Sequence, residues 1–136
     1  MKIVVTGGRD YRDRHLVFEF LDELHASSKG PISQVIHGAC GWDGDRGWSC
    51  VPWRLKGADR WADEWATERN VYLKRLPARW DSGPMGGPIR NGMLLDLKPD
   101  LVVAFPGGRG TANCVRQAED RKILVHKVAP GHGCQQ

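Results

Sequence analysis

Residues 101–111 read L-V-V-A-F-P-G-G-R-G-T, and this stretch predicts a strand, a tight turn and the start of a helix. The apolar residues from Leu101 favour a buried strand, the proline and glycines end it, and Thr111 to Asp120 is compatible with a helix. Glycines let main-chain N–H groups approach a ligand, and a helix N-terminus carries partial positive charge. We therefore expect an anion site here, most simply for phosphate. Such turns can also serve only to reverse the chain, so one turn does not decide between the two roles.

A second glycine-rich turn, Gly7-Gly8-Arg9-Asp10, follows the short apolar run from Lys2 to Thr6, which predicts a buried strand. A helix is expected over Arg14 to Ala26, because its apolar residues recur at helical spacing, and Gly30-Pro31 ends it. The chain therefore repeats the strand, glycine turn and helix arrangement at both of its ends.

The rest of the chain continues this alternation of strands and helices. The expected strands are Gln34 to His37, Val71 to Leu76 and Ile123 to Val128, and the expected helices are Arg60 to Arg69 and Pro88 to Leu97. Asp59 is suited to cap the first of these helices, and proline suits the first position of the second. Trp61 and Trp65 share one face of the first helix, so we expect them in the core or at a dimer interface.

Apolar strands that alternate with helices predict an α/β fold, because parallel strands need right-handed helical crossovers. We expect one Rossmann-like, three-layer domain over residues 1–128, with a five-stranded parallel sheet in the order 3-2-1-4-5, and a flexible tail over residues 129–136. In this order the first and fourth strands are neighbours. Both glycine turns then line one crevice at the carboxyl ends of the strands.

The composition restricts the class of protein. A chain of 136 residues is long enough for one core, and its formal net charge of +4 is modest for a nucleic-acid-binding protein. No segment has the length of a membrane span and the N-terminus lacks the apolar run of a secretion signal, so we expect a cytoplasmic protein. The four cysteines are too few and too irregular for a secreted disulfide scaffold. His37, Cys40 and Cys50 are likewise too few and too irregularly spaced to predict a zinc site.

Polar side chains near the crevice complete the predicted site. Arg90 follows Gly86-Gly87-Pro88 in the first turn of its helix, where the helix dipole disfavours a cation unless an anion lies nearby. Its guanidinium suits phosphate or carboxylate, and Asn91 can hydrogen-bond a base or a sugar. A solvated arginine with acidic neighbours is the alternative. Asp10, just after the first glycine turn, is placed to bind a ribose hydroxyl.

Five motifs occur in order along the chain. They are V-V-T-G-G-R-D-Y from Val4, H-G-A from His37, G-A-D-R-W-A-D-E-W-A from Gly57, G-P-I-R-N from Gly87 and P-D-L-V-V-A-F-P-G-G-R-G-T from Pro99. With these motifs the chain resembles the SLOG superfamily and, within it, the YspA, cpYpsA-related branch, also named DUF2493. The resemblance implies a Rossmann-like fold that binds nucleotides or nucleotide derivatives and forms a homodimer or a higher oligomer.

Members of this superfamily differ in activity, because function depends on the site and not on the fold. They include the Lonely Guy phosphoribohydrolases, which cleave the N-glycosidic bond of nucleoside 5′-monophosphates, the single-strand-binding DNA-processing protein A, and sensor domains for cyclic ADP-ribose-like signals. Arg90 matches an arginine of the hydrolases and is the candidate catalytic residue. Their signature continues to a glutamate, where this chain has Cys114 after Asn113. Neither a thiol nor an amide replaces a carboxylate well in glycoside hydrolysis.

We therefore expect a nucleoside phosphate or ADP-ribose-like ligand that is bound without turnover, as in a sensor or a sequestering module. Hydrolysis of nucleoside 5′-monophosphates, with Asp10 or Asp59 as replacement carboxylate, and single-stranded DNA binding are the alternatives. No cofactor, metal or membrane partner is expected. The predicted ligand-binding residues are Thr6, Gly7, Gly8, Arg9, Asp10, His37, Gly38, Asp59, Arg90, Asn91, Pro106, Gly107, Gly108, Arg109, Gly110 and Thr111.

Two further features have alternative interpretations. Gly41 to Lys56 is an insert relative to the resembling family, and it contains Trp42, Trp48 and Trp53 among several cations. Aromatic rings and cations stack on bases, so the insert is a candidate lid or base clamp, and packing on the body or on a second subunit is the alternative. Cys114 is expected to be a small packed residue, with a reactive thiol beside arginines as the alternative.

Overall fold

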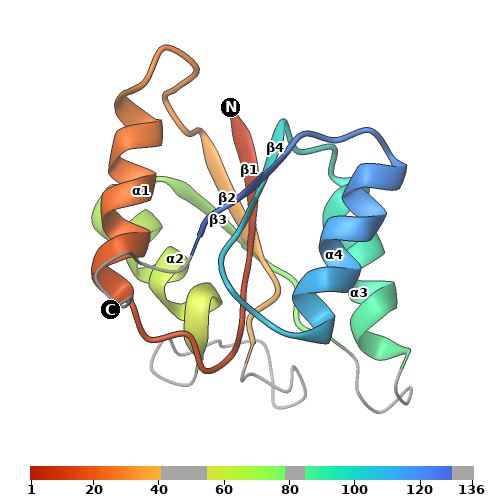
Figure 1. The fold of residues 1–136 in the computed structure, drawn as a ribbon. Helices are drawn as coiled ribbons and strands as arrows, with labels where there is room; N and C mark the ends of the chain where they lie inside the picture. The colour runs from red at the N-terminus through yellow and green to blue at the C-terminus, as the bar shows by residue number, and fades with distance from the viewer. Residues whose placement is uncertain (41–54, 79–84, 130–136) are drawn as a thin grey trace.

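The computed structural model describes residues 1–40, 55–78 and 85–129 of the chain, which alternate between strands and helices (Figure 1). The strands are β1 (Lys2–Thr6), β2 (Gln34–His37), β3 (Tyr72–Arg75), β4 (Leu101–Ala104) and β5 (Val125–Lys127), and the helices are α1 (Arg14–Ala26), α2 (Gly57–Glu68), α3 (Gly86–Asp96) and α4 (Arg109–Asp120). None of these helices combines the length and the apolar character that crossing a bilayer requires.

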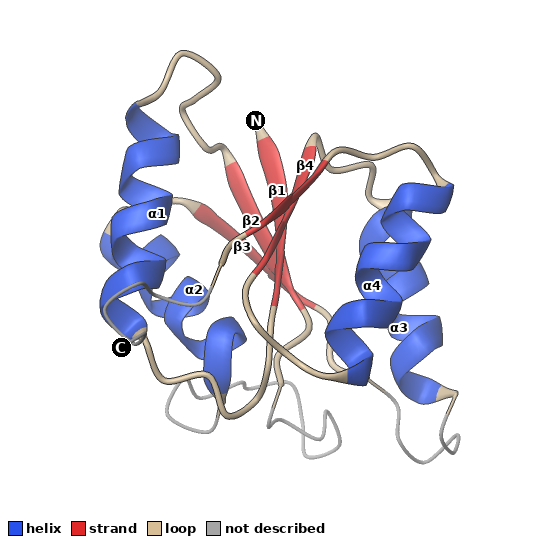
Figure 2. Cartoon of the chain, in the orientation of Figure 1, coloured by secondary structure: helices blue, strands red, loops and turns tan. Residues whose placement is uncertain are grey.

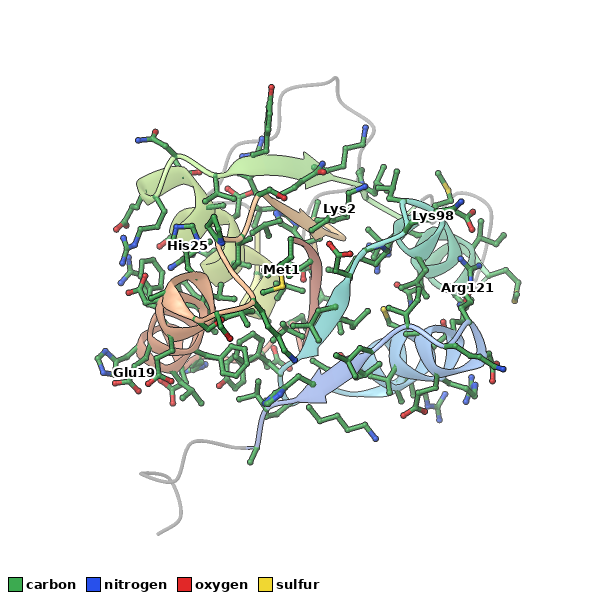
Figure 3. All side chains as sticks on the ribbon, turned by 90° about the horizontal axis from the view of Figure 1, so that it is seen from above. Met1, Lys2, Glu19, His25, Lys98 and Arg121 are labelled. Atoms are coloured by element: carbon green, nitrogen blue, oxygen red, sulfur yellow. The ribbon has the colours of Figure 1, made fainter. Side chains whose placement is uncertain are left out.

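The strands form one parallel sheet in the order β3-β2-β1-β4-β5, which confirms the predicted order. In the register of the central strands, Ile3 of β1 lies opposite Val35 of β2 and Leu101 of β4. Helices α1 and α2 cover one face of the sheet, and α3 and α4 cover the other (Figure 1, Figure 2). Seen from above in Figure 3, the sheet runs between these two pairs of helices. The fold is therefore a three-layer, Rossmann-like α/β arrangement.

The central strands are buried on both faces. Ile3 and Val5 of β1 belong to the core cluster under α1 and α2, whereas Val4 packs with Leu94 and Leu95 of α3 on the other face. Continuous apolar runs of this kind are typical of parallel strands between two layers of helices. Because helices cover both faces, a ligand site has to lie at the ends of the strands.

The two tryptophans of α2 lie in the core and at its margin. Trp65 is fully buried, and its Nε1 donates a hydrogen bond of 2.9 Å to Asp22 of α1. Trp61 is part-buried against the same cluster, and its Nε1 donates to the main-chain oxygen of Tyr11 over 2.9 Å. The two tryptophans were expected in the core or at a dimer interface, and the structure shows them packed within the chain.

Several element boundaries differ from the predicted ones. Helices α2, α3 and α4 begin at Gly57, Gly86 and Arg109, in each case two or three residues before the predicted start. Glycine is a poor helix former, so the prediction placed Gly57, Gly86 and Gly110 in turns that precede the helices. The first residues of a helix donate no intrahelical hydrogen bond, which makes glycine more acceptable there. The edge strands β3 and β5 are shorter than predicted at both ends, since each is paired on one side only.

Most of the insert and of the tail lies outside the described residues, which omit 41–54 and 130–136. The lid or clamp predicted for Trp42, Trp48 and Trp53 therefore stays a prediction, as does the flexible tail. The main-chain N–H of Lys56 donates to the oxygen of Cys40 over 2.8 Å. The insert therefore leaves and rejoins the fold at one point, just beyond the carboxyl end of β2.

Candidate ligand site

A cavity of about 1090 Å³ opens at the carboxyl ends of the strands. The turns after β1 and β4 line it, together with the first residues of α3 and α4. All of the predicted ligand-binding residues except His37 line this cavity. The prediction missed several other lining residues, among them Cys40, Gly87, Pro88, Asn113 and Arg116. The topology therefore brings the two glycine turns to one place, as the strand order requires.

The first glycine turn is used for packing. Gly8 donates its N–H to the oxygen of Pro106 over 2.9 Å, and its own oxygen accepts from the N–H of Ala58 over 3.3 Å. A Cβ on Gly7 would lie 2.5 Å from the Cβ of Ala58. Glycines at these positions allow α2 and the turn after β4 to approach β1 closely. The expectation that both turns present bare N–H groups to a ligand is wrong for Gly8.

The second glycine turn is open to the cavity at Gly108 and Gly110, whereas a Cβ on Gly107 would lie 2.6 Å from the main-chain N of Gly8. No atom lies within 4 Å of the place where a Cβ would stand on Gly108 or Gly110, and neither glycine has a positive φ. No side chain caps the N-terminus of α4, whereas Asp13 caps α1 by accepting from the N–H of Leu16 over 3.0 Å. The packing of the described residues therefore does not require glycine at these two positions. Close approach of a ligand to the main chain would require it.

Three arginines line the cavity, and no described residue binds their guanidinium groups. Within residues 1–40, 55–78 and 85–129, Arg9, Arg109 and Arg116 form no ion pair and no side-chain hydrogen bond. By contrast, Arg14 and Arg60 both bind the carboxylate of Glu64 at 3.0 Å. A concave surface with several unpaired cations attracts an anionic ligand.

Arg90 is held in place by main-chain oxygens. Its Nη1 donates to the oxygens of Gly38 at 2.6 Å and Leu76 at 3.3 Å, and its Nε donates to Asn91 Oδ1 at 3.0 Å. Because α3 begins at Gly86, Arg90 lies in the second turn and not in the predicted first turn. Its Nη2 makes no hydrogen bond within the described part of the chain. One nitrogen of a fixed guanidinium is thus available at the cavity.

Asp59 does not cap α2 as predicted. The N-cap position is Lys56, and Asp59 lies in the first turn, where its Oδ2 accepts from the N–H of Cys40 over 3.0 Å. The carboxyl group lines the cavity although the residue is only 5% exposed. Burial raises the pKa of Asp59, and the nearby His37 and Arg90 only partly oppose that rise. A buried carboxyl group with a perturbed pKa at a cavity is a candidate functional group.

His37 lies in a buried network and not at the cavity. Its Nε2 is 2.8 Å from Asp63 Oδ2, and Arg75 donates to both Asp63 oxygens at 2.6 and 3.0 Å. Its Nδ1 accepts from the N–H of Ala39 over 2.9 Å, so in the neutral ring the proton is on Nε2. Burial acts to raise the pKa of Asp63, but the hydrogen bonds from His37 and Arg75 prevail and lower it to about 2. His37 therefore holds the turn after β2, contrary to its predicted place in the site.

Asn91 connects α3 to α4. Its Nδ2 donates to the oxygen of Gly110 at 3.2 Å and to Asn113 Oδ1 at 3.1 Å, while its Oδ1 accepts from Arg90. Gln117 of α4 donates to the same Asn113 oxygen at 2.8 Å. Both ends of the Asn91 amide are thus engaged within the protein, rather than left for the predicted base or sugar.

Cys114 is packed in the core and does not line the cavity. It is fully buried in the cluster that contains Val4, Ile36 and Leu94. Burial raises the pKa of its thiol to about 11, which contradicts the alternative of a reactive thiolate. Where the resembling hydrolases have a glutamate, this chain therefore has an inert core residue. No group of three or more His, Cys, Asp or Glu side chains in the described ranges is placed to hold a metal ion.

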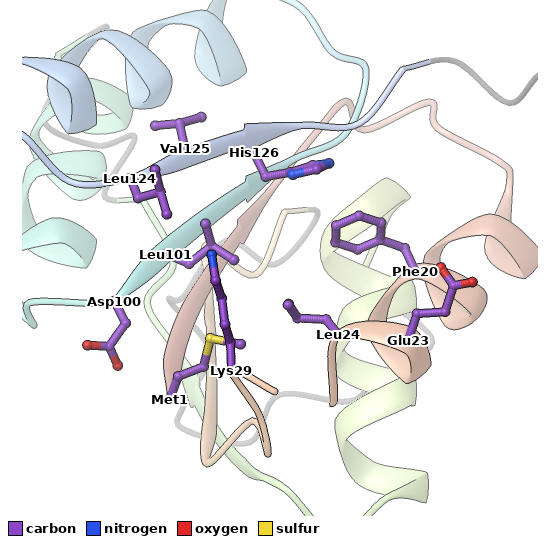
Figure 4. Close-up of a pocket in the computed structure, with 10 residues that line it drawn as sticks. All are labelled: Met1, Phe20, Glu23, Leu24, Lys29, Asp100, Leu101, Leu124, Val125 and His126. Atoms are coloured by element: carbon purple, nitrogen blue, oxygen red, sulfur yellow. The ribbon is translucent and has the colours of Figure 1, made fainter. Parts of the chain in front are cut away.

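A second cavity, of about 720 Å³, lies at the opposite, amino-terminal ends of the strands (Figure 4). Phe20 and Leu24 of α1 lie on one side of it, and Leu101, Leu124 and Val125 lie on the other. Neither a glycine turn nor a helix N-terminus contributes to its lining. It therefore lacks the main-chain features that suit a phosphate, and the cavity at the carboxyl ends is the candidate ligand site.

The first part of the chain matches a known family. Residues 1–50 match the model of the YspA, cpYpsA-related SLOG family, and they include β1, the first glycine turn, α1 and β2. Over these residues the chain is similar to that SLOG family. The match confirms the SLOG resemblance predicted from the motifs, although the motifs after residue 50 lie outside it. Comparison with curated protein sequences gave no significant match.

Two solved structures share the fold of this chain. Both are of tRNA N6-threonylcarbamoyladenosine dehydratase from E. coli, TcdA, one of them in complex with AMP. Each has a TM-score of 0.50 and 13% sequence identity over 93% of this chain. The chain spans only about half of the dehydratase, 49% and 50% in the two structures. At this identity the likeness shows the Rossmann-like fold alone.

Proposed function

We propose that this protein binds a nucleotide or a nucleotide derivative, a nucleoside phosphate or an ADP-ribose-like molecule, as a sensor or a sequestering module. The phosphate binds at the N-terminus of α4. The observation that carries this proposal is the open turn of Gly108 and Gly110, which the packing of the fold does not explain. An uncapped helix N-terminus offers N–H groups and partial positive charge to such an anion.

The charges around the turn support the same ligand class. Arg9, Arg109 and Arg116 surround the cavity and have no partners in the described chain. Arginine suits phosphate because its planar fork can donate two parallel hydrogen bonds. Truncation of Arg109 should therefore weaken binding, whereas Arg12, which does not line the cavity, is a matched control.

Binding without turnover is preferred over hydrolysis of nucleoside 5′-monophosphates. The family signature places a glutamate where this chain has Cys114, and that side chain is in the core. A carboxylate that stabilises an oxocarbenium-like centre or activates water is therefore missing from that position. Arg90, the matched arginine, makes three hydrogen bonds to the protein, so a positioning role explains it without catalysis.

Calorimetry with AMP, ADP-ribose and cyclic ADP-ribose, followed by chromatography of each mixture, tests the proposal. We expect saturable binding of at least one of them, recovery of that molecule intact, weaker binding by Arg109→Ala and unchanged binding by Arg12→Ala. Release of free base that Arg90→Ala abolishes would instead establish the hydrolase alternative. No binding of any nucleotide, together with DNA binding that weakens steeply with salt, would establish single-stranded DNA as the ligand.

Self-association is a further proposal, which rests on the family resemblance. Size-exclusion chromatography with light scattering distinguishes a homodimer or higher oligomer from a monomer. A cytoplasmic location is proposed likewise, and fractionation of the source cells tests it.

A further inference from the structure

Another part of the cavity is polar and largely buried. We call Gly38, Asp59 and Arg90 the polar cluster. Gly38 lies between the two charged residues, since its oxygen accepts from Arg90 at 2.6 Å and its N–H is near enough to the carboxyl group of Asp59 to act to lower the pKa of that group. Asp59 is also held by the N–H of Cys40. Both side chains are therefore fixed by main-chain groups before any ligand arrives.

The polar cluster still has an acceptor and a donor to offer. Within the described residues, Asp59 forms no salt bridge with an arginine or lysine, and Arg90 Nη2 makes no hydrogen bond. Each carboxyl oxygen can accept more than one hydrogen bond. A carboxyl acceptor beside a guanidinium donor matches two neighbouring hydroxyl groups, because one hydroxyl donates to the first while the other accepts from the second.

An anion is disfavoured at this cluster. In its charged form the carboxyl group of Asp59 would repel a phosphate that approached Arg90 Nη2, whereas a neutral hydroxyl carries no such cost. Around the α4 turn the cations Arg109 and Arg116, both residues of α4, favour the phosphate. The cavity therefore has a phosphate end and a hydroxyl end.

The two ends are close enough for one ligand to span them. Gly38 follows β2 and Pro106 follows β4, and both strands are direct neighbours of β1. Two strand spacings of about 4.8 Å place these strand ends roughly 10 Å apart. Gly8 makes hydrogen bonds to both sides, to Pro106 and to Ala58 beside Asp59. A sugar phosphate with side-chain contacts at each end fits that separation.

We propose that Asp59 and Arg90 bind the vicinal hydroxyls of a ribose, so that the site selects ribonucleotides over 2′-deoxyribonucleotides. The proposal rests on the proposed function and adds to it the sugar that the site recognises. Asp10, the aspartate predicted to bind ribose, is exposed at the cavity mouth, where water competes for a hydroxyl. Asp59 is 5% exposed, so a hydrogen bond to it is less weakened by water.

Calorimetry with ribose 5-phosphate, 2-deoxyribose 5-phosphate and inorganic phosphate tests this selection. A hydrogen bond to a charged group contributes about 1.5 to 3 kcal/mol, so wild type should prefer the ribose compound by roughly tenfold to a hundredfold. Asp59→Asn should lose this preference and keep its affinity for inorganic phosphate, because the asparagine oxygen can still accept from Cys40. Asp10→Asn should retain the preference.

Each other outcome has a definite meaning. Equal affinity of wild type for the two sugar phosphates, or loss of the preference in Asp10→Asn instead, overturns the role of the polar cluster and leaves the phosphate site intact. Failure of all three probes, and of AMP, ADP-ribose and cyclic ADP-ribose, to bind overturns the proposed function as well. Where Asp59→Asn does not fold, Arg90→Lys decides, because lysine can still reach the Gly38 oxygen but has no second nitrogen. A preference retained in Arg90→Lys contradicts the proposal.

Discussion

Arg90 Nη1 lies 2.6 Å from the main-chain oxygen of Gly38, and its guanidinium occupies the space that a Cβ on Gly38 would need. A side chain at residue 38 would collide with this guanidinium. The two residues are 52 positions apart in the chain and come from the end of β2 and from α3. Glycine at position 38 is therefore explained by the arginine, and the arginine is positioned by the glycine.

We expect Gly38→Ala to destabilise the protein by about 1 to 3 kcal/mol, because it displaces Arg90 from buried main-chain acceptors. Urea unfolding of Gly38→Ala, Arg90→Ala and the double variant measures this coupling. The alanine should cost less in the Arg90→Ala background, where the collision is gone. Gly108→Ala is the matched control, since a Cβ there meets no atom within 4 Å. Additive costs in the double variant would refute the coupling.

Gly110→Ala should separate stability from ligand binding. Gly110 is in the first turn of α4 with free space for a Cβ, so alanine should raise the free energy of unfolding by up to about 1 kcal/mol. The added methyl group should at the same time keep a phosphate away from the main chain and weaken AMP binding about tenfold, or 1.4 kcal/mol. Urea unfolding and calorimetry measure the two effects.

Gly92→Ala is the control for that experiment. Gly92 is in α3 away from the cavity, and a Cβ there would lie 3.3 and 3.4 Å from the ends of the Gln117 and Arg121 side chains. Gly92→Ala measures how a methyl group in a helix changes the free energy of unfolding, and it should leave ligand binding unchanged. Unchanged AMP affinity in Gly110→Ala would mean that the open turn does not contact the ligand.

Asp63 should contribute to stability in a pH-dependent manner. Its pKa is about 2 in the folded protein against an ordinary value of 3.8, so the unfolded chain takes up the proton first as the pH falls. The contribution is therefore complete above about pH 5 and is lost as the pH falls from there toward 2. The difference of nearly two pKa values corresponds to about 2 kcal/mol.

Urea unfolding of wild type and Asp63→Asn between pH 2 and pH 7 tests this contribution. At neutral pH the wild type should have a higher free energy of unfolding than Asp63→Asn. This difference in free energy should narrow by about 2 kcal/mol toward pH 2. Asp22→Asn is the comparison, since Asp22 pairs with Arg69 but its side chain is 45% exposed, and its effect should be smaller. A difference in the free energy of unfolding between wild type and Asp63→Asn that is constant with pH would contradict the prediction.

Cys114 should resist alkylation in the native protein. Its side chain is fully buried and its thiol pKa is raised to about 11, so the reactive thiolate is scarce near neutral pH. Treatment with iodoacetamide at pH 8, followed by peptide mass spectrometry, should leave Cys114 unmodified until urea is added. Cys40, which is half-buried at the cavity, should react sooner. Rapid native labelling of Cys114 would restore the reactive-thiol alternative.

The sequence by itself was sufficient for the order of the sheet and for the position of the cavity. The apolar runs from Lys2 and Leu101 and the helical spacing after Arg14 are local patterns, and right-handed crossovers leave few ways to connect them. Glycines after β1 and β4 then had to meet, because those strands are neighbours.

Only the tertiary structure decided which of these groups remain available to a ligand. The N–H of Gly8 is taken by Pro106, the ring of His37 by Asp63 and the amide of Asn91 by α4, while Gly108 and Gly110 stay open. A hydrogen-bonding group takes whichever partner the fold brings within about 3 Å, and here those partners lie 19 or more positions away along the chain. No local pattern encodes such a pairing, so residue type and spacing located the site but could not say which of its groups are free.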